Sequence, residues 1–109
     1  MALHKASDAD FQEHLQNHDT VVVKYFANWC GSCKLIAPKF RKLAEREPYQ
    51  DLTFLDINAE ENPEARKAAG VTNLPFFAIF HKGKKVEGDT TAKIEGVEAM
   101  IQRAIKEEA

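Results

Sequence analysis

Hydrophobic residues in this chain form two kinds of pattern, short continuous runs and repeats with helical spacing. The run TVVVKYFA, residues 20–27, is rich in β-branched and aromatic residues and predicts a strand that is covered on both faces. LTFLDI, residues 52–57, predicts a second strand. FFAIF, residues 76–80, and a weaker segment at residues 85–89 flank the turn sequence HKGK, and together they predict an antiparallel hairpin.

Two helices are predicted around the first strand. Phe11 and Leu15 lie on one face of a helix over residues 8–17, and Ser7 with the Asp three residues later resembles a capping box. After the first strand, apolar residues recur at helical spacing from about residue 33 to 47, with Pro38 inside the repeat as an expected kink.

Two further helices follow the second strand and the hairpin. Asn62 is placed to cap a short helix that has Pro63 at its first position and Gly70 just past its end. The last helix, over residues 95–107, carries its apolar residues on one face and is expected to pack on the sheet.

This order of elements predicts the fold class. Strands and helices alternate and a hairpin and a helix follow, which favours a single domain over residues 1–109, an α/β three-layer sandwich around a central mixed sheet. In such sheets the reactive groups gather at the carboxyl ends of the parallel strands. The turn after residue 27 lies at one of these ends, so this turn is the first place to look for chemistry.

Charge and composition exclude several function classes. The formal net charge is -2, from 15 basic and 17 acidic residues interspersed along the chain, which argues against a nucleic-acid or membrane-surface protein. The first residues, MALHKASDADF, lack the apolar stretch of a secretory signal, and no segment has the 18 or so apolar residues of a membrane span. We therefore expect a soluble, cytoplasmic protein, in which a persistent structural disulfide is disfavoured.

Both cysteines of the chain lie in that turn, in the sequence CGSC. At the start of a helix, free backbone N–H groups and the helix dipole stabilise the thiolate of Cys30 and lower its pKa from about 8.5 toward roughly 3.5–7.5. Cys33, one turn further along, can reach back and resolve a mixed disulfide between Cys30 and a substrate. This spacing therefore predicts thiol–disulfide exchange.

Three other interpretations of the pair stay open on spacing alone. The cysteines could form a structural disulfide, or serve only as small buried residues. A zinc site would need two more ligands, and the histidines, at positions 4, 14, 18 and 81, are distant in sequence.

The sequence WCGSCK resembles the active site of the thioredoxin family, which usually has Pro at the position of Ser32. The similarity extends over nearly the whole chain, through VVVKYFANWC, IAPKF, NPEARKAAGV, NLP and FHKGKKV, in the family's order. The resemblance implies the thioredoxin fold and a cis peptide bond before Pro75. It also implies an apolar substrate groove beside the cysteines, to which it assigns Trp29, Gly31, Ser32, Leu74, Pro75 and Thr91.

Lys24 departs from the family pattern, because similar proteins usually bury an aspartate there. The neighbouring strand carries Asp56 where some members have lysine, so the two charges have exchanged places. Each lies within an apolar strand, and burying either one alone would cost several kcal/mol, so we expect an ion pair behind Cys33. Asp56 would then accept the proton of Cys33 while Lys24 favours its thiolate. The alternative places Asp56 at a solvated strand end and lets the Lys24 ammonium reach the surface.

Two more departures concern the rim of the site. Ser32 adds an N–H and a hydroxyl near the Cys30 thiolate, which predicts a less reducing couple than the proline form. Thr91 replaces the usual glycine beside the groove, and its side chain is expected to narrow the approach of a substrate.

The resemblance implies a thiol:disulfide oxidoreductase that reduces disulfide-containing proteins and uses no metal or bound organic cofactor. It would be recharged by a thioredoxin-reductase-like donor, most simply an NADPH-dependent flavoprotein, and would act as a monomer. The alternative is a binding or scaffold module on the same fold, in which the disulfide chemistry is incidental. Retention of both cysteines favours the enzyme.

Overall fold

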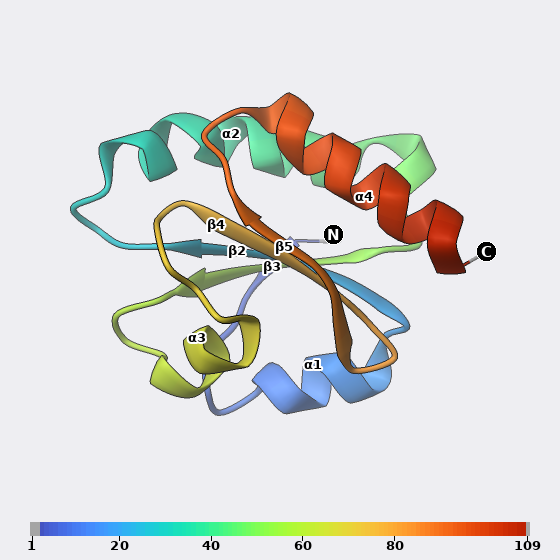
Figure 1. The fold of residues 1–109 in the computed structure, drawn as a ribbon, viewed down its shortest axis with the longest axis horizontal. Coiled ribbons are helices and arrows are strands. Elements are labelled where there is room, and N and C mark those ends of the chain that lie inside the picture. The colour runs from blue at the N-terminus through green and yellow to red at the C-terminus, as the bar shows by residue number, and fades with distance from the viewer. Residues whose placement is uncertain (1–2, 109) are drawn as a thin grey trace.

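The computed structural model describes residues 3–108, without the Glu108 side chain. Within these residues, five strands and four helices follow one another, alternating except where the fifth strand directly follows the fourth (Figure 1). The strands are β1 (Leu3–Lys5), β2 (Thr20–Phe26), β3 (Thr53–Asn58), β4 (Phe76–His81) and β5 (Lys84–Thr90). The helices are α1 (Phe11–Asn17), α2 (Gly31–Glu45), α3 (Pro63–Ala69) and α4 (Ile94–Glu108), with a 3₁₀ turn at Glu47–Tyr49. None of these helices is long and apolar enough to cross a membrane.

The strands form one mixed sheet in the order β1-β3-β2-β4-β5. β1, β3 and β2 are parallel, whereas β4 is antiparallel to both β2 and β5. Figure 1 shows α2 and α4 on one side of the sheet and α1 and α3 on the other. The predicted three-layer sandwich with a mixed sheet is confirmed.

The position of β2 in the sheet explains why its sequence is apolar at nearly every position, with Lys24 as an exception. Val22 belongs to the core between the sheet and the α2–α4 layer. Val21, Val23 and Tyr25 belong to the opposite core, against α1 and α3. Because successive side chains of a strand point to opposite faces, a strand between two layers must be apolar at nearly every position.

Sequence reasoning missed β1, which has only three residues. It pairs with β3 through Leu3↔Phe54, His4↔Leu55 and Lys5↔Asp56. Three residues are too few to show an alternating pattern, and two of them are exposed at the sheet edge. Only its pairing with β3 makes this segment a strand.

The predicted start of α1 was wrong by three residues. One of the two hydrogen bonds of the predicted capping box is present: the Ser7 N–H donates to Asp10 Oδ1 at 2.8 Å. Asp8, however, does not continue the helix. Its carboxylate accepts hydrogen bonds from the N–H groups of Glu64 and Ala65, at 3.1 and 2.8 Å, and so caps α3 from a remote part of the chain.

Asn62 does precede α3, but its side chain does not cap that helix. Asn62 Oδ1 instead accepts from the Asp8 N–H at 2.8 Å, which fixes the residue that does the capping. At the other end, Gly70 has φ +67°, so the predicted left-handed residue that ends α3 is confirmed. The turn between β4 and β5 likewise has positive φ at Lys82 and Gly83.

α2 begins and ends two residues earlier than predicted, with Pro38 inside it. The segment around Pro48 forms the separate 3₁₀ turn, because proline at residue 48 cannot continue the hydrogen-bonding pattern of the α-helix. The earlier start matters for function. It places Cys30 directly at the N-cap of the helix, and Cys33 in its first turn.

Candidate functional site

Cys30 and Cys33 form a disulfide at the junction of β2 and α2, with their Cα atoms 5.3 Å apart. The chain leaves the carboxyl end of β2 and turns, and the Cys30 N–H donates to the Ala27 carbonyl at 3.1 Å. Both cysteines are buried in this oxidised state, at 4% and 2% exposed. The predicted pairing of the two sulfurs is therefore possible without any backbone movement.

The start of α2 supplies the hydrogen bonds expected for a stabilised sulfur anion. The Cys33 N–H donates to Cys30 Sγ at 3.2 Å, as an N-cap contact. The Ser32 hydroxyl lies 3.8 Å from the same sulfur. Backbone N–H groups and the positive end of the helix dipole stabilise a negatively charged sulfur at this position, so Cys30 is suited to be the attacking thiolate once the disulfide is reduced.

Trp29 lies beside the disulfide and is 69% exposed, as expected for a contact platform rather than a core residue. Its indole N–H donates to Glu60 Oε2 at 2.7 Å. Sequence reasoning missed Glu60, because the bond joins residues 31 positions apart and no local pattern marks it. Gly31, the first residue of α2, is also exposed and has open space where a side chain would project.

The loop before β4 approaches the disulfide from the other side. The Leu74–Pro75 peptide bond is cis, as the resemblance implied. Leu74 packs against both cysteines and Ala27. The Pro75 carbonyl accepts a hydrogen bond from Thr90 Oγ1 at 2.8 Å, which ties this loop to β5.

Trp29 and Leu74 line one cavity of about 250 Å³. The rest of its lining comes from the segments around α3, namely Ala59, Glu60, Arg66, Val71, Thr72 and Asn73. Pro75 and Thr91 do not line it. The structure thus brings together part of the groove residues that the sequence predicted, and adds two charged residues, Glu60 and Arg66, to the walls.

Thr91 makes its contacts toward α4. Its Oγ1 accepts from the Lys93 N–H at 3.1 Å, in the turn that leads into the helix. A Cβ added to Gly96 would lie 2.9 Å from the same oxygen, so the Thr91 side chain occupies the space that this glycine leaves empty. The expected narrowing of the substrate groove by Thr91 stays a prediction.

Lys24 and Asp56 are direct partners in the register of β2 and β3, and Lys24 Nζ lies 3.2 Å from Asp56 Oδ1. The predicted ion pair is confirmed. The Lys24 side chain is 4% exposed and lies over the rings of Phe26 and Phe40, at 5.5 and 5.7 Å, so it does not reach solvent. The Asp56 side chain keeps 20% of its surface exposed.

The contact between Lys24 and Asp56 is electrostatic rather than a well-aligned hydrogen bond. Although Oδ1 of Asp56 is close to the ammonium, it has no hydrogen-bond partner. An ionised carboxylate has lone pairs that can accept a proton, but the Lys24 ammonium beside Oδ1 favours its charged form and makes it a weaker base.

The ion pair and the resolving cysteine share a second cavity of about 250 Å³. Its walls include Lys24, Asp56 and Cys33, together with Lys5, Phe26, Ala27, Asn28, Lys34 and Ala37. A third cavity, of about 470 Å³, reaches the other side of Asp56, where it is lined by Ser7, Asn58 and Glu61 among others. Asp56 therefore lies between the space behind Cys33 and a second solvent-accessible space.

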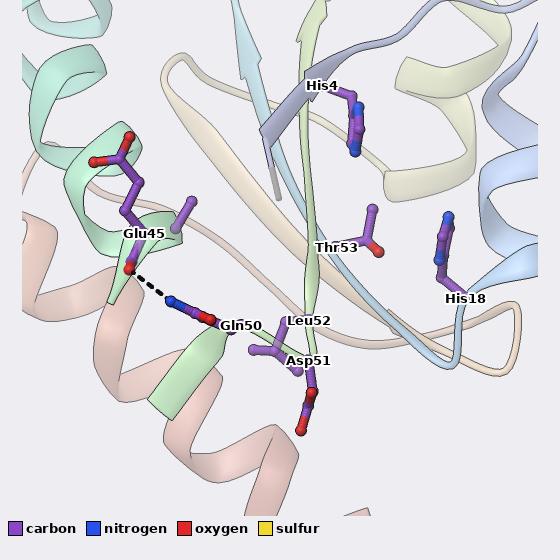
Figure 2. A pocket seen from close by; sticks show the side chains of 8 residues that line it. His4, His18, Glu45, Gln50, Asp51, Leu52 and Thr53 are labelled. Atoms are coloured by element: carbon purple, nitrogen blue, oxygen red, sulfur yellow. Dashed lines mark hydrogen bonds between the residues drawn. The ribbon is translucent and has the colours of Figure 1, made fainter. Parts of the chain in front are cut away.

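Another cavity, of about 710 Å³, lies far from the disulfide, at the amino end of β3. Figure 2 shows His4 above Thr53 and His18 to its right, and Gln50 reaching toward Glu45 on the α2 side. None of the predicted site residues lines it. Within residues 3–108, no group of three or more His, Cys, Asp or Glu side chains is placed to hold a metal ion.

Comparison with known proteins agrees with this geometry. The family model described as Thioredoxin matches residues 2–106. Thioredoxin-1 of Schizosaccharomyces pombe is 36% identical over 93 residues, which cover 83% of this chain and 88% of that protein.

Solved structures agree as well. The short form of thioredoxin f from spinach chloroplast has a TM-score of 0.86 and 33% identity, over 94% of this chain and 93% of that one. A thioredoxin chain in a structure titled as a complex of ferredoxin:thioredoxin reductase and thioredoxin f2 has a TM-score of 0.86 and 31% identity, covering 94% of both chains.

Proposed function

This chain belongs to the thioredoxin family and is a thiol:disulfide oxidoreductase, and we propose that it works as a reductase of protein disulfides. One observation carries the proposal. A disulfide sits at the N-cap of α2, with the Cys33 N–H directed at Cys30 Sγ and an exposed Trp29 beside it. A sulfur held in this way is an efficient leaving group and, when reduced, an efficient nucleophile.

The exchange proceeds in two steps. In the reduced enzyme the Cys30 thiolate attacks one sulfur of a substrate disulfide, a mixed disulfide forms, and the other substrate sulfur leaves as a thiolate. Cys33 then loses its proton and attacks Cys30 Sγ, which releases the second substrate sulfur and forms the Cys30–Cys33 disulfide. Two electrons pass from the enzyme to the substrate.

Asp56 is the residue that we assign to the proton of Cys33. The two side chains line the same cavity, and Asp56 is the only carboxylate among the residues that line it. Lys24 cannot accept a proton while it is charged, but its ammonium favours the Cys33 thiolate by attraction. In this arrangement Asp56 would remove the proton of Cys33, and Lys24 would stabilise the Cys33 thiolate that results.

The proton transfer is tested by single-turnover kinetics on a reduced enzyme. Asp56→Asn should slow the resolution of the mixed disulfide about 10-fold or more, in the range of a lost general base, and leave the initial attack by Cys30 nearly unchanged. Cys33→Ser is the control in which resolution stops altogether. Equal rates for both steps in wild type and Asp56→Asn would remove Asp56 from the mechanism.

The protein binds no cofactor of its own and is recharged by a reductase partner, as its family is. An NADPH-dependent flavoprotein is the simplest donor. The similar thioredoxin f2 chain that was solved with a ferredoxin:thioredoxin reductase supports a reductase of that type as the alternative donor. Incubating the oxidised protein with each purified reductase, and following thiol release, distinguishes the two donors. A cytoplasmic location and a monomeric state complete the proposal, and cell fractionation and sedimentation test them.

The reductase function is tested with insulin as the disulfide substrate and dithiothreitol as the electron source. Wild type should accelerate insulin precipitation well above dithiothreitol alone, and Cys30→Ser should return the rate to that baseline. If wild type and Cys30→Ser behave alike, the chain is instead a binding or scaffold module on this fold.

A further inference from the structure

Exposed apolar side chains lie on the turn before the disulfide and on α2, the helix that follows it. Within the described residues, the large hydrophobic side chains that remain exposed are Trp29 at 69%, Leu35 at 77% and Ile105 at 38%. Trp29 directly precedes Cys30, and Leu35 lies two positions after Cys33, on the exposed side of α2. Leu35 projects away from the core, because its neighbour Ile36 is the residue that faces the sheet.

Leu35 belongs to a stripe along the outer face of α2. At 3.6 residues per turn, Leu35, Pro38 and Lys42 follow one another along the helix, and all three are exposed. Exposed basic residues border this stripe on both sides, at Lys34, Lys39 and Arg41. We name the six residues Lys34, Leu35, Pro38, Lys39, Arg41 and Lys42 the α2 face.

The α2 face has a charge opposite to that of the whole chain. No Asp or Glu occurs between residues 28 and 44, whereas the chain as a whole has 17 acidic against 15 basic residues. In the described part of the chain, the salt bridges involve none of the four basic residues of the α2 face. These cations are therefore available to a partner.

The other side of the disulfide carries a group of three acidic residues, with Arg66 of α3 in the same cavity lining as Glu60. Glu60, which accepts the hydrogen bond of Trp29, is followed by Glu61, and Glu64 lies in the first turn of α3. All three are exposed. A protein that approaches the disulfide thus meets positive charge over α2 and negative charge over the β3–α3 connection, which fixes the orientation that electrostatics favours.

We propose that the α2 face selects the protein substrate: it binds a segment next to the target disulfide that carries carboxylates around one apolar side chain. The carboxylates would contact Lys39, Arg41 and Lys42, and the apolar side chain would cover Leu35 and Pro38. This inference rests on the proposed reductase function and names the class of substrate. Opposite charges across such a contact raise mainly the association rate, so the selection acts on kcat/KM.

The test uses three disulfide-bridged peptides that share a leucine beside the bridge and differ only in two flanking residues, Asp, Ser or Lys. At about 50 mM salt we expect kcat/KM for the acidic peptide to exceed that for the basic peptide roughly 10-fold, as steering by a few charges allows. At 1 M NaCl the Debye length is about 3 Å, and the ratio should approach one.

Charge reversal locates the effect. Lys39→Glu/Lys42→Glu should reverse the preference, while Lys82→Glu/Lys84→Glu, with the same change in net charge, should keep the wild-type ratio. The control lysines flank the β4–β5 turn, at the end of β4 away from the disulfide (Figure 1). Leu35→Ser should lower kcat/KM for all three peptides about 3-fold or more, since each carries the leucine.

Two results would overturn the proposal. One is equal kcat/KM for the acidic and basic peptides in wild type at low salt; the other is the same loss of preference in both double variants, which would assign it to net charge. The serine peptide distinguishes failure of the α2 face proposal from failure of the proposed reductase function. If wild type reduces it no faster than Cys30→Ser does, the reductase function fails, whereas reduction without discrimination removes the α2 face alone.

Discussion

The ion pair of Lys24 and Asp56 is buried unequally, and removing its two members should therefore have unequal effects on stability. The Lys24 side chain is 4% exposed and the Asp56 side chain is 20% exposed. Asp56→Asn keeps the shape but leaves a nearly buried ammonium without its counter-charge. Lys24→Met leaves a carboxylate that borders two cavities and that water can reach. We expect Asp56→Asn to be the more destabilising change.

The magnitude follows from the distance between the charges. At the 3.2 Å between Nζ and Oδ1, two unit charges attract each other by about 5 kcal/mol if the effective dielectric constant is about 20. The cost of desolvating Lys24 offsets part of this attraction, and the Phe26 and Phe40 rings would still stabilise the unpaired ammonium by about 1 kcal/mol. Asp56→Asn should then cost about 2–3 kcal/mol, and Lys24→Met about 1 kcal/mol.

Urea unfolding of the oxidised protein at pH 7 measures these differences. With a slope of about 1.5 kcal/mol/M, a loss of 2–3 kcal/mol lowers the midpoint by roughly 1.3–2 M. The double variant Lys24→Met/Asp56→Asn closes the cycle, and it should be more stable than Asp56→Asn alone because no charge is left buried. The reasoning is refuted if Lys24→Met costs as much as Asp56→Asn, or if the two losses simply add.

Three further predictions concern other contacts. Ser32→Pro removes the hydroxyl near Cys30 Sγ and should make the couple more reducing by roughly 20 mV, about 1 kcal/mol for two electrons, in a glutathione or dithiothreitol redox titration; an unchanged or less negative potential would contradict this. Gly96→Ala should destabilise wild type by about 1 kcal/mol, because the new Cβ meets Thr91 Oγ1 at 2.9 Å. In a Thr91→Gly background the same change should be stabilising, because alanine has the higher helix propensity. Thermal melts that show a stability change of the same sign in both backgrounds would refute the contact. Asp8→Ala should cost about 1–2 kcal/mol in urea unfolding, because it removes the cap of α3; a loss under about 0.3 kcal/mol would mean that water replaces the carboxylate.

Local patterns were sufficient wherever burial alone decides structure. The continuous apolar run of β2 and the helical repeat of α2 identify these elements, because a strand between two layers and a helix on one layer impose different periods. The cysteine spacing gave the chemistry for the same reason. Residues three apart at a helix start lie one turn apart, where two sulfurs can bond.

Element ends and short segments needed the folded chain. β1 is a strand only because β3 lies beside it, and α1 starts late because Asp8 is used to cap α3. Both depend on contacts between residues about 50 positions apart, and neither leaves a periodic signal in the sequence. The hydrogen bond of Trp29 to Glu60, 31 positions apart, is of the same kind.

The sequence by itself determined the alternation of strands and helices, the position of the cysteine pair at the end of a strand, and the presence of two opposite charges in neighbouring apolar strands. Tertiary structure alone decided that these charges lie 3.2 Å apart, that the lysine is the more buried of the two, and that both share a cavity with Cys33. The physical reason is that side-chain period and residue type are encoded locally, whereas distance, depth and access to water depend on strand register and on how the layers close over the sheet.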